Sequence, residues 1–124
     1  MLFEKNKESG IKVMHYEGIN GFATDYPCRI ELKDNDFVIT RIKPETIVTL
    51  SLNRISSFTA MEEQRFMQEY HGNAATTSKS GIKKYYLVVK YDKGMLAFWG
   101  TGTEYGEFIN LQNNAANTPA TIKL

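Results

Sequence analysis

The sequence has little cysteine, no long apolar run and almost no net charge. A single cysteine, Cys28, excludes an intramolecular disulfide and any zinc site built from several cysteines. No apolar stretch approaches the roughly 18 residues that a membrane-spanning helix needs. Fifteen lysines and arginines face fourteen aspartates and glutamates, so overall charge gives no reason to bind nucleic acid. The first ten residues mix charges without a following apolar stretch, so we expect no secretory signal and a cytoplasmic protein.

A length of 124 residues corresponds to one domain that is large enough to bury its own core. We expect residues 1–10 to form a flexible lead-in and residues 11–114 to form the domain. Residues 115–124 read as a polar tail, because the apolar periodicity stops and a proline enters the chain.

Alternation of apolar and polar residues is the strongest pattern in the chain. In residues 28–33, Cys28, Ile30 and Leu32 alternate with charged residues, which is the period of a half-buried strand. Short polar breaks separate such segments, and turns of two to four residues favour antiparallel neighbours. The pattern predicts about seven strands, at residues 11–16, 28–33, 37–42, 46–52, 55–61, 83–91 and 95–99.

The segment from Glu62 to His71 fits two structures. Phe66, Met67 and Tyr70 have helical spacing, but the segment could also extend the preceding strand as an edge of the sheet. We predict the edge strand here. The small and polar residues from His71 to Gly81 then predict a mobile loop.

The last segment predicts one amphipathic helix. Thr101 and Glu104 have the spacing of a capping box, and Tyr105, Phe108, Ile109 and Gln112 follow on one mostly apolar face. A single helix can close one open end of a bent sheet. The predicted fold class is therefore mainly β (α+β): a bent antiparallel sandwich or partly open barrel of about seven strands, closed by one C-terminal helix.

Several segments carry a resemblance to a known family. They are Tyr16–Phe22, Pro27–Leu32 leading into Asp36–Ile39, Leu50–Ile55 and Lys84–Tyr91. With this strand order and closing helix, the chain resembles the pleckstrin-homology (PH) fold, and more narrowly small bacterial and phage-encoded PH-like proteins, over Val13 to Trp99. Such relatives often carry a glycine-rich apolar insert, suggestive of membrane contact, where this chain has the polar loop Gly72–Gly81.

Two segments are candidate anion-binding sites. PH domains that bind phosphoinositides gather basic residues in the loop after the first strand, but here Gly18–Pro27 contains Asp25 and no lysine, so we do not expect this activity. Lys79, Lys83 and Lys84 form the compact basic cluster, next to two tyrosines. We interpret it as a solvated loop and do not expect nucleic acid as a partner.

Residues that could carry chemistry fit structural roles better. Cys28 has the register of Ile30 and Leu32, which predicts core packing. Gly100–Gly106 has G-x-G-x-x-x-G spacing, which differs from a dinucleotide-binding loop and suits a turn into the capped helix. His15 and His71 lie far apart in the sequence, so we expect no metal site. We also expect no cofactor and no catalytic site. Phe98 and Trp99 have two interpretations. They pack between the helix and the sheet or, if they are exposed, they form an apolar interface patch.

The sequence therefore predicts a non-enzymatic PH-like interaction module that binds a protein partner or itself. Strand addition needs only an open edge, and the Glu62–Tyr70 segment is the predicted edge, with Phe66, Met67 and Tyr70 as apolar anchors. The alternative is peripheral association with anionic membrane lipid through the Gly72–Lys84 region, with Lys79, Lys83 and Lys84 as the anion contacts.

Overall fold

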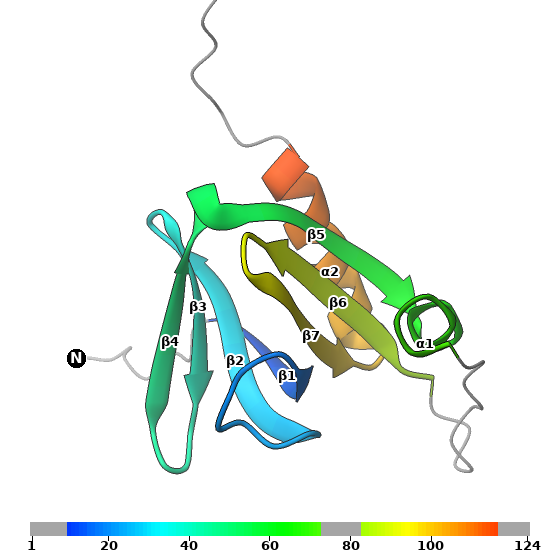
Figure 1. Ribbon diagram of the computed structural model, residues 1–124, viewed down its shortest axis with the longest axis horizontal. Coiled ribbons are helices and arrows are strands. Elements are labelled where there is room, and N and C mark those ends of the chain that lie inside the picture. The colour runs from blue at the N-terminus through cyan, green and yellow to red at the C-terminus, as the bar shows by residue number, and fades with distance from the viewer. Residues whose placement is uncertain (1–9, 73–82, 117–124) are drawn as a thin grey trace, which may run out of the picture.

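The computed structural model describes residues 10–72 and 83–116, which form one seven-stranded sheet with two α-helices (Figure 1). The strands are β1 (Ile11–Glu17), β2 (Tyr26–Lys33), β3 (Asp36–Arg41), β4 (Thr46–Ser51), β5 (Ile55–Glu62), β6 (Tyr85–Tyr91) and β7 (Gly94–Gly100). The helices are α1 (Glu63–His71) and α2 (Gly102–Ala116), and a 3₁₀ turn, Leu52–Arg54, joins β4 to β5. This architecture confirms the predicted fold class.

All neighbouring strands are antiparallel, in the order β4-β3-β2-β1-β7-β6-β5. The sheet is bent and does not close into a barrel, because β4 and β5 at its two ends do not pair. Strands β1 and β7 pair in the middle, with an irregular register between His15 and Glu17. The strands on either side of this pair thus turn one face of the sheet toward a shared interior. We call this face the inner face and the opposite one the outer face.

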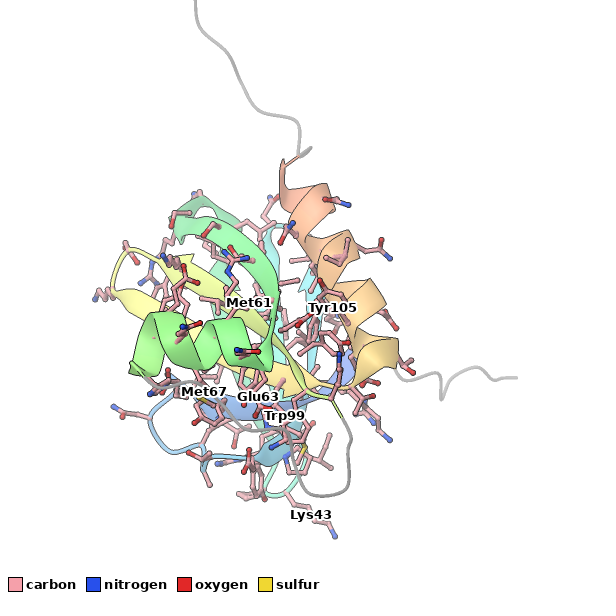
Figure 2. All side chains as sticks on the ribbon, turned by 90° about the vertical axis from the view of Figure 1, so that its right-hand side faces the viewer. Lys43, Met61, Glu63, Met67, Trp99 and Tyr105 are labelled. Carbon is pink, nitrogen blue, oxygen red and sulfur yellow. The ribbon has the colours of Figure 1, made fainter. Side chains whose placement is uncertain are left out.

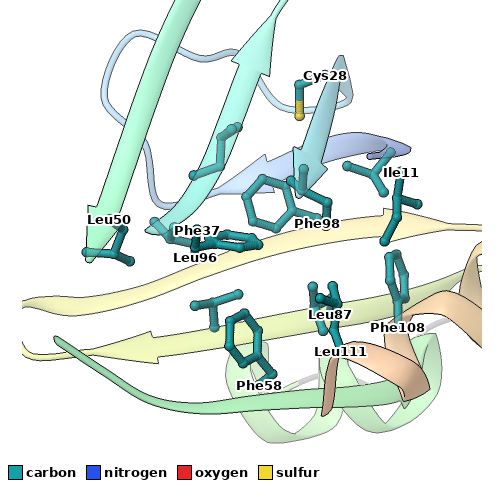
Figure 3. Packing of buried hydrophobic residues seen from close by; sticks show 14 of the residues in the cluster. Ile11, Cys28, Phe37, Leu50, Phe58, Leu87, Leu96, Phe98, Phe108 and Leu111 are labelled. Carbon is teal, nitrogen blue, oxygen red and sulfur yellow. The ribbon is translucent and has the colours of Figure 1, made fainter. Parts of the chain in front are cut away.

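The main core lies on the inner face of the bent sheet (Figure 3). Each strand contributes alternate apolar side chains, which is why the period of two was visible in the sequence. Fully buried members include Ile30, Phe37, Ile39, Leu87 and Phe98. Cys28 is buried among them, as its register predicted.

Helix α2 closes one end of this interior. Phe108 is fully buried and Leu111 nearly so, and both join the main core. One half of the predicted capping box is present, since Glu104 Oε1 accepts a hydrogen bond from Thr101 N at 2.7 Å; it also accepts one from Thr101 Oγ1 at 2.8 Å. The helix extends to Ala116, two residues into the expected tail. The expected lead-in and the rest of the tail lie outside the described residues, except for Gly10.

The predicted edge strand at Glu62–Tyr70 is wrong, because most of this segment forms helix α1. Glu62 is extended and ends β5, and Gly72 ends the helix in a left-handed conformation with φ of 71°, its N–H donating to Met67 O. The segment contains strong helix formers and no β-branched residue. These local preferences outweigh the extension of β5. Most of the predicted loop that follows lies outside the described residues.

Helix α1 covers the outer face of the sheet, opposite α2, as Figure 2 shows for strands β5–β7. Phe66 packs there with Met61, Tyr86 and Val88, whereas Leu87 and Val89 face the main core. Strand β6 is therefore buried on both faces, which agrees with its nearly continuous apolar sequence. None of the described helices is long and apolar enough to cross a membrane.

Candidate functional site

The predicted anchors on α1 do not form an exposed edge. Phe66 is fully buried, and its ring stacks on Tyr86 with the centroids 4.2 Å apart. Met67 and Tyr70 are half-buried, and Lys90 Nζ lies 5.5 Å from the centroid of the Tyr70 ring. Phe66 therefore belongs to the interior. Binding through these three residues stays a prediction, but its premise of an open strand is lost.

The rings of Tyr16, Phe66 and Tyr86 pack against one another beneath α1, and carboxylates lie near them. Burial raises the pKa of Tyr86 and, less strongly, the pKa of Tyr16, and the negative charges of Glu63 and Glu17 act in the same direction. His71 Nε2 lies 3.1 Å from Glu17 Oε2 and connects the end of α1 to the end of β1. The geometry suits a packed joint between helix and sheet.

The structure describes two of the three predicted lysines. Lys79 lies outside the described residues, and Lys83 is exposed. Lys84 Nζ lies 4.4 Å from the centroid of the Trp99 ring, a cation–π distance. Anion binding by this cluster stays a prediction.

One edge of the sheet, β5, has a backbone amide that is occupied by a side chain. The amide of Ala60 donates a hydrogen bond of 2.8 Å to Gln112 Oε1 from α2. The pairing of β5 with β6 is also irregular between Ile55 and Ser57, and bulges of this kind protect sheet edges. The irregularity turns Ile55 toward the main core, away from the face that carries Met61.

The other edge, β4, is open. Its register with β3 is regular over all six residues, Thr46–Ser51, and no strand pairs with its far side in the described parts of the chain. Figure 1 shows β4 at the left boundary of the molecule. The strand contains no charge, proline or bulge, which are the usual protections of an edge. Ile47 is 60% exposed, more than any other large apolar side chain described.

A pocket of about 370 Å³ lies mainly on the outer face, where β1, β2 and β7 meet the start of α2. The register places Met14 beside both Pro27 and Trp99, and Ile42 follows the end of β3. These four residues are apolar members of the lining, which we call the floor of the outer-face pocket. Figure 2 labels Trp99 below α1.

Charged residues stand around this floor. Lys12, Arg29 and Glu104 line the outer-face pocket. At Trp99, Asp25 Oδ1 accepts the indole N–H at 2.7 Å, and Lys84 lies over the ring. Trp99 and Phe98 thus have separate roles, because Phe98 is buried on the inner face and Trp99 is half-buried on the outer one.

Sequence reasoning missed how the loop after β1 is held. His15 is buried, its Nε2 accepts from Ile19 N at 3.2 Å, and its Nδ1 therefore donates to Ala23 O at 2.9 Å. Arg41 donates to Gly21 O at 2.8 Å and lies over the Phe22 ring. The Arg41 guanidinium also donates to Pro44 O and to Thr46 Oγ1.

The described residues contain no group of three or more metal-ligating side chains. Burial raises the pKa of the Cys28 thiol to about 12, which disfavours the reactive thiolate. Comparisons with protein-family models, curated proteins and solved structures found no match. Function must therefore be argued from the open edge and the outer-face pocket.

Proposed function

We propose that the chain is a non-enzymatic interaction module of the PH-like type that assembles with a second copy of itself through β4. The observation that carries this proposal is the contrast between the two edges. Edge β5 has an irregular register and its Ala60 amide is occupied by Gln112, whereas β4 is uncharged, regular and carries the exposed Ile47. An edge without protection pairs readily with another strand.

A second copy fits β4 because the strand has no charge that would repel its own copy. Most soluble oligomers are symmetric, and a two-fold interface uses one patch twice. When two copies of β4 pair antiparallel about a two-fold axis at Ile47, the two Ile47 side chains lie directly opposite each other on the outer face. The large apolar side chain that is most exposed among the described residues is then removed from water in both chains.

Sedimentation equilibrium tests this proposal. We expect the wild-type protein to form dimers as its concentration rises from low micromolar to millimolar. Ile47→Lys should be monomeric, because two like charges would meet across the strand pair. Ile42→Lys is the matched control, since Ile42 is 47% exposed but lies outside β4 and should leave dimerisation unchanged.

A charge-swap experiment makes the test specific. Ile47→Lys and Ile47→Glu should each be monomeric alone and should form a heterodimer when mixed. A monomeric wild type, or a dimer that Ile47→Lys does not weaken, would contradict the proposal. Salt-sensitive binding to anionic vesicles that is lost in Lys83→Glu, with no dimer, would instead favour the membrane alternative.

A further inference from the structure

The outer-face pocket lies where two neighbouring strands separate. Strand β1 pairs with β2 from Ile11 onward but with β7 only from Met14 onward. The chain ends β7 at Gly100 and turns into α2, so a space opens between the start of β1 and the start of the helix. Its volume of about 370 Å³ falls within the roughly 300–1,000 Å³ of ligand pockets. The path of the backbone thus leaves a cavity large enough for a small molecule.

The floor of this pocket is apolar and partly open to water. It consists of Met14, Pro27, Ile42 and Trp99, and the side chains of Met14 and Trp99 are only half-buried. Ile42 is 47% exposed and is one of only two large apolar side chains that are exposed among the described residues. A ligand in the pocket would remove this surface from water, which is favourable in proportion to the apolar area covered.

The charged side chains of the pocket give no excess charge of either sign. Among the described residues that line it, Lys12 is positive, Glu104 is negative, and Arg29 already has an interaction partner. Glu104 is fixed in the wall, because its Oε1 accepts hydrogen bonds from Thr101 and its stem lies against Gly100. An ion that entered the pocket would lose hydration without a net opposite charge to replace it. The lining therefore favours an uncharged ligand.

We propose that the outer-face pocket binds an uncharged, largely apolar small molecule. The ligand lies on Met14, Ile42 and Trp99, between the start of β1 and the start of α2, and any hydroxyl that it carries faces water. This inference goes beyond the pairing of β4 and does not depend on it, because Ile47 does not line the pocket.

The test compares three probes that share one tail, 1-hexanol, hexanoate and hexylammonium, by ¹H–¹⁵N NMR titration. We expect hexanol to bind saturably and to shift the amides of Met14 and Ile42 and the indole N–H of Trp99. Both ions should bind about tenfold more weakly than hexanol, and their affinities should agree within about threefold. From 1-butanol to 1-hexanol the affinity should rise about fourfold for each methylene, because each one is buried on the floor.

Matched variants of two exposed isoleucines locate the site. Ile42→Lys places a charge in the floor and should weaken hexanol binding about tenfold. Ile47→Lys should leave this affinity unchanged, although it should abolish dimerisation through β4. Both side chains are exposed, so neither exchange should disturb folding. The two variants therefore separate a failure of the pocket from a failure of the β4 pair.

A third variant tests the balance of charge. Lys12→Glu leaves the lining with an added carboxylate, so hexylammonium should then bind more tightly than hexanoate. The proposal would be overturned by a wild-type protein that binds either ion better than hexanol, or by the absence of a saturable shift at the pocket. Unchanged hexanol affinity in Ile42→Lys, or equal affinity for the two ions in Lys12→Glu, would also overturn it.

Discussion

Polar side chains inside this molecule serve to hold the chain in place. Neutral His15 uses both ring nitrogens on the loop after β1, with one accepting from Ile19 and one donating to Ala23. Within the described residues, every buried side-chain nitrogen and oxygen has a hydrogen-bond partner. Because a buried polar group without a partner is costly, these contacts fix the loop and leave the groups unavailable for chemistry.

Cys28 makes stability sensitive to alkaline pH. Burial raises the pKa of its thiol from 9.0 to about 12 in the folded state. Its contribution to stability is complete below pH 9 and is lost as the pH rises from 9 toward 12, because only the unfolded thiol ionises there. Between pH 8 and 10.5, the free energy of unfolding in urea should fall by up to about 2 kcal/mol more in the wild type than in Cys28→Ala.

The comparison isolates the thiol because both proteins keep Tyr16 and Tyr86, whose pKa values are also raised. Parallel stability curves for the wild type and Cys28→Ala over this pH range would contradict the prediction.

At the scale of elements, the sequence predicted the strands and α2 well, because half-buried elements show their period locally. It missed α1, although Gly72 and His71 were helix-ending signals beside Phe66 and Tyr70. The open edge could not be found this way, since the strand order depends on the long-range pairing of β1 with β7. The outer-face pocket was hidden for the same reason: Met14, Pro27, Ile42 and Trp99 come from four separate segments.

Gln112 should contribute more to the stability of the fold than its position on a helix surface suggests. Gln112→Ala removes the acceptor of the Ala60 amide, so we expect unfolding to become easier by about 1 to 2 kcal/mol. Amide hydrogen exchange at Ala60 should become faster.

The control is Gln112→Glu, which keeps an oxygen acceptor at the same distance along the side chain and should preserve most of the protection at Ala60. Unchanged protection at Ala60 in Gln112→Ala would show that the helix surface, and not the hydrogen bond, protects this amide of β5.

In the whole molecule, strands β5–β7 are packed on both faces. The main core with α2 lies on the inner face, and the cluster around Phe66 lies on the outer one. Because β6 supplies Leu87 and Val89 to one side and Tyr86 and Val88 to the other, the two clusters cannot come apart without disrupting the same strand.

Unfolding should therefore be a single transition. Phe66→Ala and Phe108→Ala, one in each cluster and both fully buried, should each cost about 3 to 5 kcal/mol and lower the same midpoint. Far- and near-ultraviolet circular dichroism during thermal unfolding would measure this. Met67→Ala, at a half-buried position on α1, should cost less. Two separate transitions, with Phe66→Ala moving only one, would show that α1 folds independently.

Trp99 is the chain's single tryptophan, and it lies in the floor of the outer-face pocket with its indole N–H on Asp25. Indole fluorescence responds to the polarity and charge around the ring. All tryptophan emission of this protein therefore originates at one defined surface site. Filling of the pocket, movement of Lys84 away from the ring or loss of the Asp25 contact would each change the emission spectrum without any attached dye.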